Sequence, residues 1–273
     1  MFKFNFDAEE CEVSDAESAE SNELIWDPFK EVSTKETVFT SQDCITKFTC
    51  RELKFQIVDA SKSYEKSEPE KLKSCSIFQS LQTSHSDLLT AKYEGGFKIW
   101  ECTYDLLHYL IDNNIDLRNK TILDLGCGVG ILGMYALQNG ATVHFQDYNV
   151  DVLKYATIPS VSHSFGNTNN CRFFAGDWSF FCKENTSTKY DCILSSETIY
   201  NPKNYDKLCA VFEEKLKPNG YGLLGAKSFY FGVGGSTLEF EKKVDARKKM
   251  NCSKCWTFSN GLQREILKIS HLS

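Results

Sequence analysis

The sequence predicts an α/β fold, a doubly wound and mostly parallel sheet with helices on both faces and one antiparallel edge strand. From about residue 99 onward, short apolar runs of strand length alternate with stretches of helical periodicity. The apolar run at 121–125 passes through glycines directly into a helical stretch, which is typical of a buried parallel strand. Near the end of the chain, two short apolar runs flank Asn260-Gly261 and predict a hairpin.

The individual elements follow from apolar spacing and from the residues that end each element. In the first helix, Cys102, Leu106 and Leu110 recur every four positions and form one apolar face. Gly140 ends the second helix, because glycine accepts the left-handed conformation found at helix C-termini. We expect helices at residues 99–113, 131–139, from about 150, 203–216 and 237–248. We expect strands at residues 121–125, 142–146, 171–174, 190–195, 221–226, 255–258 and 265–269.

The N-terminal part of the chain differs in composition from the rest. Residues 1–31 carry ten acidic and two basic side chains, a net charge of −8, whereas the whole chain carries −6. Residues 1–75 show little sustained periodicity, and we expect a largely flexible segment there. The apolar islands at 24–26 and 55–58 are then docking segments or one added strand. The folded domain is expected to cover residues 76–273.

Composition excludes several classes of protein. No stretch approaches the roughly 20 apolar residues that a membrane-spanning helix needs, and the first residues show no apolar signal segment. The 12 cysteines are scattered through a long chain, so we expect reduced thiols in the cytosol or nucleus. Cys252 and Cys255 form one CxxC without a second pair, so no metal site is expected.

The loop after the first strand predicts the ligand. Asp124 ends an apolar run, and Gly126, Gly128 and Gly130 follow at every second position. Glycines let the backbone approach a ligand closely, and the acid can receive an ammonium group. Together they indicate S-adenosylmethionine. The alternative is a dinucleotide, since Gly128 to Gly133 matches G-x-G-x-x-G, but Asp124 would repel a pyrophosphate.

Further polar residues stand at the ends of the next strands, where ligands bind in doubly wound folds. Asp147, 23 residues after Asp124, can accept hydrogen bonds from both ribose hydroxyls. Asp177 can accept from the adenine amino group, and Trp178 can pack beside the ring. Each residue alone could simply cap a helix or form a turn. Their order at successive strand ends favours the cofactor site.

Six longer motifs occur in order along the chain. They are Ser84-His-Ser-Asp87-Leu, Tyr93-Glu-Gly-Gly96-Phe-Lys-Ile-Trp100-Glu-Cys-Thr103, Asp124-Leu-Gly-Cys-Gly128, Phe145-Gln-Asp-Tyr-Asn149, Ser196-Glu-Thr-Ile-Tyr-Asn-Pro202 and Tyr230-Phe-Gly-Val-Gly-Gly235. These motifs closely resemble the protein-histidine N-methyltransferases, which belong to the Rossmann-like seven-β-strand class. The resemblance covers about residues 80–273 and the opening Phe-Lys-Phe-Asn-Phe. The long insert and basic nuclear signal that these proteins carry after the second helix are not evident here.

The resemblance implies which residues contact the cofactor. It places these contacts at the start of the first helix, in the glycine loop, and at the ends of the second, third and fourth strands. Together with the residues reasoned from the glycine loop, the expected set is Ile99, Trp100, Glu101, Cys102, Thr103, Asp124, Gly126, Gly128, Gln146, Asp147, Tyr148, Gly176, Asp177, Trp178 and Ser196.

The resemblance also implies a target, a histidine of a large-subunit ribosomal protein. A histidine is largely neutral at cytosolic pH and needs no strong base, so the site has to choose which ring nitrogen faces the methyl group. Glu197 and Tyr200 are candidates for that role and Asn201 is a weaker one, although all three could simply form loop structure. Phe229, Tyr230 and Phe231 either line a target channel or belong to the core.

Two other functions stay open at this point. One is a lysine methyltransferase acting on a translation factor, and the other is a noncatalytic module that binds the cofactor and a partner. We expect a monomer in the cytoplasm and nucleus that contacts neither a membrane nor a specific nucleic-acid sequence.

Overall fold

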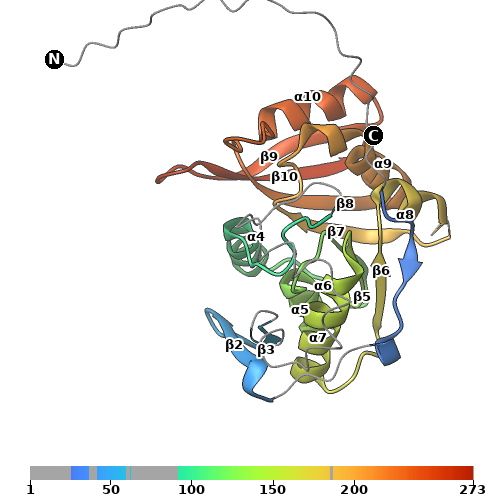
Figure 1. Ribbon diagram of the computed structural model, residues 1–273. Coiled ribbons are helices and arrows are strands. Elements are labelled where there is room, and N and C mark those ends of the chain that lie inside the picture. Colours follow the sequence, from blue (N-terminus) through green and yellow to red (C-terminus); the bar gives the residue numbers. More distant parts are fainter. Residues whose placement is uncertain (1–25, 37–41, 60–61, 63–91, 185–186, 273) are drawn as a thin grey trace, which may run out of the picture.

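The computed structural model describes residues 26–36, 42–59, 62, 92–184 and 187–272 (Figure 1). The motif at residues 84–88 and most of the acidic segment therefore lie outside the described residues. Within the described part of the chain, no helix has both the length and the apolar character needed to cross a membrane.

The centre of the molecule is an eight-stranded sheet with the order β1-β6-β5-β4-β7-β8-β10-β9. Its strands are β1 (Lys30–Glu31), β4 (Thr121–Leu125), β5 (Thr142–Asp147), β6 (Cys171–Ala175), β7 (Tyr190–Ser196), β8 (Leu216–Lys227), β9 (Met250–Phe258) and β10 (Arg264–His271). The strands from β4 to β8 pair in parallel, which confirms the predicted doubly wound, mostly parallel sheet. All seven strands expected from the sequence are present, and β1 adds an eighth.

The antiparallel strand of the C-terminal hairpin is not at the edge of the sheet, where we expected it. β10 lies between β8 and β9 and is antiparallel to both, so β9 becomes the edge strand. Burial gives the reason. Ile266 of β10 packs into the core on one face of the sheet, whereas Leu267 and Ile269 pack into the core on the other. A strand buried on both faces belongs inside a sheet, and most of β9 is exposed or half-buried.

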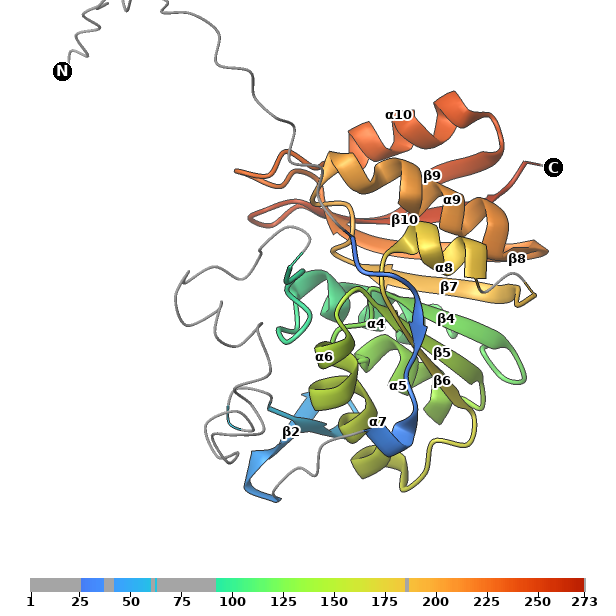
Figure 2. The same cartoon turned by 45° about the vertical axis from the view of Figure 1, so that its right-hand side comes forward.

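Helices cover both faces of the sheet, as Figure 2 shows. One face carries α4 (Glu101–Asp112), α5 (Ile131–Gln138), and a continuous helical stretch of α6 (Val150–Val152), η3 (Leu153–Thr157) and α7 (Ile158–Phe165). The other face carries α8 (Trp178–Glu184), α9 (Tyr205–Lys215) and α10 (Thr237–Arg247). Neighbouring residues of β4 point to opposite faces, so Ile122 joins the first core and Leu123 the second. The seven-residue α8 was not among the helices expected from the sequence, because it is too short and too rich in aromatic residues to show a helical apolar period.

Part of the N-terminal segment is ordered, which differs from the flexible segment expected at residues 1–75. β2 (Ile45–Cys50) and β3 (Leu53–Val58) form an antiparallel hairpin that packs on α7. The backbone N–H of Val58 donates to the Ser160 hydroxyl at 2.9 Å, and Phe48 and Phe55 are buried in the core. These aromatic residues bury enough apolar surface to order a segment whose overall composition is polar.

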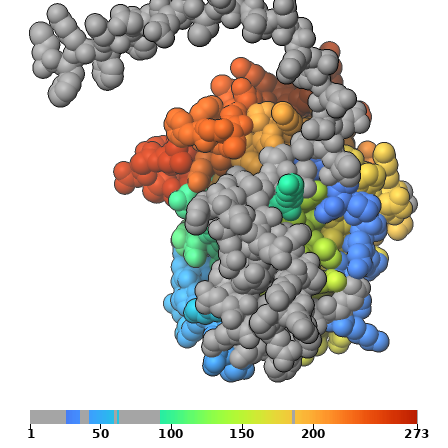
Figure 3. All heavy atoms as spheres, viewed as in Figure 1, coloured from blue at the N-terminus to red at the C-terminus, as the bar shows by residue number. Residues whose placement is uncertain are grey.

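Residues 26–36 also pack against the folded domain. Figure 1 shows this stretch running along the outer edge of the sheet, beside β6 and α8, and in Figure 3 it lies on the surface of the molecule. β1 pairs antiparallel with β6, with Lys30 opposite Ala175. The island at residues 24–26 thus leads into the added strand that we had considered.

His144 on β5 makes stability depend on pH. It is buried beside Phe174, and its Nδ1 lies 3.0 Å from the Tyr190 hydroxyl. Burial lowers the pKa of His144 from 6.5 to about 4, with a smaller contribution from Arg172. The unfolded chain then binds more protons below pH 6.5, so this contribution to stability is complete above that pH and is lost as pH falls toward 4. We expect the free energy of unfolding in urea to fall by about 2 kcal/mol from this group between pH 7 and pH 5.

The variant His144→Gln isolates this contribution, because glutamine can accept the Tyr190 hydroxyl but does not titrate. Its free energy of unfolding should fall less between the two pH values than that of the wild type. Equal losses in both proteins would contradict a buried neutral imidazole.

Candidate functional site

A cleft enclosing about 870 Å³, part of it open to solvent, lies at the carboxyl ends of β4, β5, β6 and β7. This is where ligands bind in doubly wound folds. The structure brings most of the expected site residues together in its lining, namely Ile99, Trp100, Thr103, Asp124, Gly126, Gly128, Asp147, Tyr148, Gly176, Asp177, Trp178, Ser196, Glu197 and Tyr200. Four expected residues, Glu101, Cys102, Gln146 and Asn201, are not part of that lining.

The glycine loop is shaped by positive φ angles and close contacts. Gly126 has φ +65°, and a Cβ there would lie 2.6 Å from Cγ2 of Thr198. Gly128 has φ +51°, and a Cβ there would lie 2.9 Å from the Gly96 carbonyl oxygen. Side chains are excluded at both positions, so the cleft is floored by bare backbone.

Two buried carboxyl groups face this loop. Asp124 is 1% exposed and accepts a hydrogen bond from Gly133 N–H at 2.8 Å, yet burial raises its pKa to about 8. Asp147 accepts from Gly128 N–H at 2.9 Å and from Asn149 N–H at 3.1 Å, and burial raises its pKa to about 6. Burial disfavours the charged form of both acids, so a cation or hydroxyl donors in the cleft would stabilise their carboxylates.

The loops after β5 and β6 are tied together by Gln146. Its side chain donates to the Gly176 carbonyl at 2.8 Å and accepts from the Trp178 indole N–H at 2.8 Å. Gln146 therefore does not line the cleft but holds Gly176 and Trp178, which do. Asp177 is 5% exposed and forms an ion pair with Lys207 at 2.7 Å. Lys207 comes from α9, and the sequence motifs gave no indication of this partner.

Sequence reasoning also missed Trp26 and Asn204, both of which line the cleft. Asn204 is 7% exposed and its Oδ1 has no hydrogen-bond partner, one of two such buried side-chain atoms in the described part of the chain. An unpaired buried acceptor costs free energy unless a ligand supplies a donor. Neither residue stands in a strand-end motif, so no spacing in the sequence could have pointed to it.

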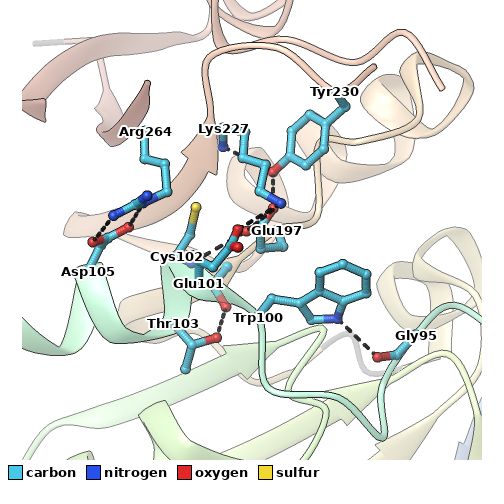
Figure 4. A network of polar contacts seen from close by, with 11 residues as sticks. Gly95, Trp100, Glu101, Cys102, Thr103, Asp105, Glu197, Lys227, Tyr230 and Arg264 are labelled. Atoms are coloured by element: carbon cyan, nitrogen blue, oxygen red, sulfur yellow. Dashed lines mark hydrogen bonds and ion pairs between the residues drawn. The ribbon is translucent and has the colours of Figure 1, made fainter. Parts of the chain in front are cut away.

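One end of the cleft is built around Glu197 (Figure 4). Its Oε2 accepts a hydrogen bond from the Tyr230 hydroxyl at 2.6 Å, and its Oε1 accepts from Cys102 N–H at 3.4 Å, at the start of α4. The Lys227 ammonium lies 4.0 Å from Oε1 and 2.9 Å from the Glu101 carboxylate. Cys102 and Glu101 therefore act on the site from outside the lining, by holding Glu197 and Lys227.

The start of α4 contributes Trp100 and Thr103 to the cleft. The Trp100 indole N–H donates to the Gly95 carbonyl at 3.1 Å, and the Lys98 ammonium lies 4.7 Å from the centre of the indole ring. The Thr103 and Ser196 hydroxyl oxygens are 2.8 Å apart and join α4 to the end of β7. The Thr103 contact fixes α4 against the end of β7, whereas the Trp100 contacts lie within the loop that leads into α4 (Figure 4).

Tyr200 lines the same end, but Asn201 does not. The Tyr200 ring packs against Tyr230 with ring centres 6.5 Å apart, and its carbonyl accepts from Gly235 N–H at 3.0 Å. Asn201 instead accepts from Lys203 N–H at 3.1 Å and caps the short helix η4 (Pro202–Asn204). Its side chain thus serves the loop, which is the structural alternative considered above.

The loop that carries Tyr230 also exposes two large apolar side chains. Phe231 is 78% exposed and Phe229 is 42% exposed, and their rings contact each other edge to face. They are therefore not part of the core. They belong to the same short loop as Tyr230, whose hydroxyl reaches Glu197.

The residues present fit S-adenosylmethionine. The cleft offers buried carboxyl groups that gain from a cation, bare glycine backbone, and an unpaired amide oxygen that needs a donor. A ligand with an ammonium group at one end and a nucleoside at the other satisfies all three.

Comparison with known proteins agrees with this chemistry. A family model described as a methyltransferase domain matches residues 116–269, more than half of the chain. The chain is 42% identical over 217 residues to a protein of Bos taurus named histidine protein methyltransferase 1 homolog, covering 69% of this chain and 58% of that protein. It is 38% identical over 188 residues to a protein of the same name from Dictyostelium discoideum, covering 68% and 61%.

These relatives confirm the resemblance inferred from the motifs, although the chain spans only about three fifths of their length. Among solved structures, the PH0226 protein from Pyrococcus horikoshii OT3 superposes with a TM-score of 0.50 at 14% identity, covering 62% of this chain and 90% of that one. At that identity the likeness concerns the fold alone.

Proposed function

Because the chain belongs to the methyltransferase domain family, with S-adenosylmethionine as methyl donor, we propose that it methylates a histidine imidazole nitrogen in a protein. The observation that carries the proposal is the fixed carboxylate of Glu197, which lines the cleft and is held by Tyr230 and the start of α4. The names of the relatives support histidine as the acceptor.

The chain would hold its donor by the contacts described above. S-adenosylmethionine supplies a methyl group on a sulfonium sulfur. Asp124 and Asp147 both line the cleft, and we propose that Asp124 pairs with the ammonium end and that Asp147 accepts from ribose hydroxyls. Transfer needs the nucleophile in line with the methyl carbon and sulfur, so orientation of the acceptor is the main task left to the protein.

Glu197 would perform that orientation. A neutral imidazole has one N–H and one free nitrogen, and it is the dominant form near pH 7. By accepting the N–H, the Glu197 carboxylate would turn the free nitrogen toward the methyl group without removing a proton. Tyr200 lines the cleft beside Tyr230, whose hydroxyl bonds this carboxylate, and would border the imidazole ring.

We further propose that the substrate is a large-subunit ribosomal protein. The enzyme would act on it as a monomer in the cytoplasm or nucleus. The motif resemblance supports this choice of substrate. Phe229 and Phe231 offer an exposed apolar contact for a protein chain that enters beside Glu197.

Mass spectrometry tests the function directly. The full chain is incubated with large-subunit ribosomal proteins and S-adenosylmethionine carrying a deuterated methyl group, and tryptic peptides are sequenced by tandem mass spectrometry. We expect the labelled methyl group on histidine. Label on lysine would overturn the histidine assignment in favour of a lysine methyltransferase, and no label on any of these proteins would overturn the ribosomal substrate.

A further inference from the structure

We propose that Trp26 contacts the bound cofactor, and that residues 26–31, the N-terminal strap, close the nucleoside end of the cleft. The inference rests on the proposed function only for the identity of the donor. It does not depend on which side chain is methylated.

Trp26 lines the cleft although it lies far in sequence from every other lining residue. Its indole meets the Tyr148 ring edge to face, with ring centres 5.7 Å apart. The Lys207 ammonium lies 3.4 Å from the centre of the Trp26 ring and also pairs with Asp177 at 2.7 Å. The indole is therefore held in place by Tyr148, which follows β5, and by Lys207 of α9, which is itself paired with Asp177 after β6.

Backbone contacts hold the strap against the same two loops. Asp27 N–H donates to the Tyr148 hydroxyl at 3.2 Å, and the Asp27 carbonyl accepts from Asp177 N–H at 3.0 Å. A Cβ on Gly176 would lie 2.3 Å from the Pro28 carbonyl oxygen, so only glycine lets the strap approach this closely. The loop after β6 is thus shaped to receive the strap, which continues into β1 at the sheet edge.

These contacts lie at the end of the cleft where the nucleoside of the cofactor would bind. Asp147 and Asp177, which can accept from ribose and adenine donors, stand beside Tyr148 and Lys207 respectively. Asn204, with its unpaired Oδ1, lies one helical turn before Lys207 at the start of α9. A purine ring has a large π-face, and an indole at its site is a favourable partner for it.

The test is the affinity for S-adenosylhomocysteine, measured by isothermal titration calorimetry on the full chain. Trp26→Ala should raise its Kd about tenfold, since the purine would lose an aromatic ring on which to stack. Trp256→Ala is the matched control, because Trp256 is also half-buried but lies on β9, outside the cleft lining. Trp26→Phe keeps a ring at this position and should give an intermediate Kd.

Hydrogen exchange of the wild-type protein gives a second readout that needs no variant. A ligand covered by the strap stabilises the strap's closed position, so saturating S-adenosylhomocysteine should slow exchange in the peptide that contains residues 26–32. An unchanged Kd in Trp26→Ala, or unchanged exchange in this peptide, would overturn the role of the strap. Failure of the wild type to bind S-adenosylhomocysteine would overturn the donor itself, and with it this inference.

Discussion

Replacing Gly126 with arginine should abolish binding of S-adenosylhomocysteine. Gly126 has φ +65°, and any Cβ there meets Thr198 at 2.6 Å, so the arginine would displace the loop and fill the floor of the cleft. Because the ligand would lose its place against the loop, we expect the Kd to rise about 100-fold or more, which corresponds to roughly 2.8 kcal/mol of binding free energy. Isothermal titration calorimetry with the purified variant measures it.

Gly166→Arg is the control for backbone strain. Gly166 ends α7 with φ +73°, and a Cβ there meets no atom within 4 Å. Arginine at either position occupies the left-handed region and carries a similar conformational cost of about 1–3 kcal/mol. Only Gly126→Arg should lose binding. If it bound the ligand like the wild type, the glycine loop would not be the floor of the cofactor site.

The fold could be predicted because its determinants are local. The apolar run at 121–125 and the helix that follows gave the first strand and its loop, and similar runs gave the other six strands. The position of β10 could not be predicted, because it depends on how Leu267 and Ile269 pack against helices distant in sequence. The place where the strap docks could not be predicted for a similar reason, since its position depends on contacts with Tyr148 and Gly176 rather than on its own composition.

The candidate site shows the same division. Residues at strand ends, such as Asp124, Asp147 and Asp177, could be found because parallel strands bring their carboxyl ends to one edge. Gln146 stands among them in sequence, but strand alternation turns its side chain behind the cleft. Asn204 lies inside a loop and helix start, where only the unpaired oxygen in the structure distinguishes it.

Glu197→Gln should reduce kcat about 100-fold, because a hydrogen bond to a charged group is worth roughly 1.5–3 kcal/mol. The Glu197 carboxylate accepts from both Tyr230 and Cys102, and an amide offers only one oxygen to these two donors. The NH₂ group of the glutamine would then face either the Tyr230 hydroxyl or the Cys102 N–H, both of which are donors. The oxygen that should accept from the substrate's imidazole N–H would no longer be available. The Kd for S-adenosylhomocysteine should not change, because the contacts assigned to the donor remain.

Two variants separate orientation from folding. Glu265→Gln alters another buried glutamate, one that accepts a hydrogen bond from the Thr237 hydroxyl outside the cleft lining, and it should leave kcat unchanged. Tyr230→Phe removes one donor but leaves Cys102 N–H, so kcat should fall less than in Glu197→Gln. A wild-type kcat in Glu197→Gln, measured on the methylated histidine peptide, would show that the carboxylate does not orient the acceptor. A lower kcat with an equally weakened Kd would instead mean that Glu197 supports the whole cleft, through its contact with the start of α4.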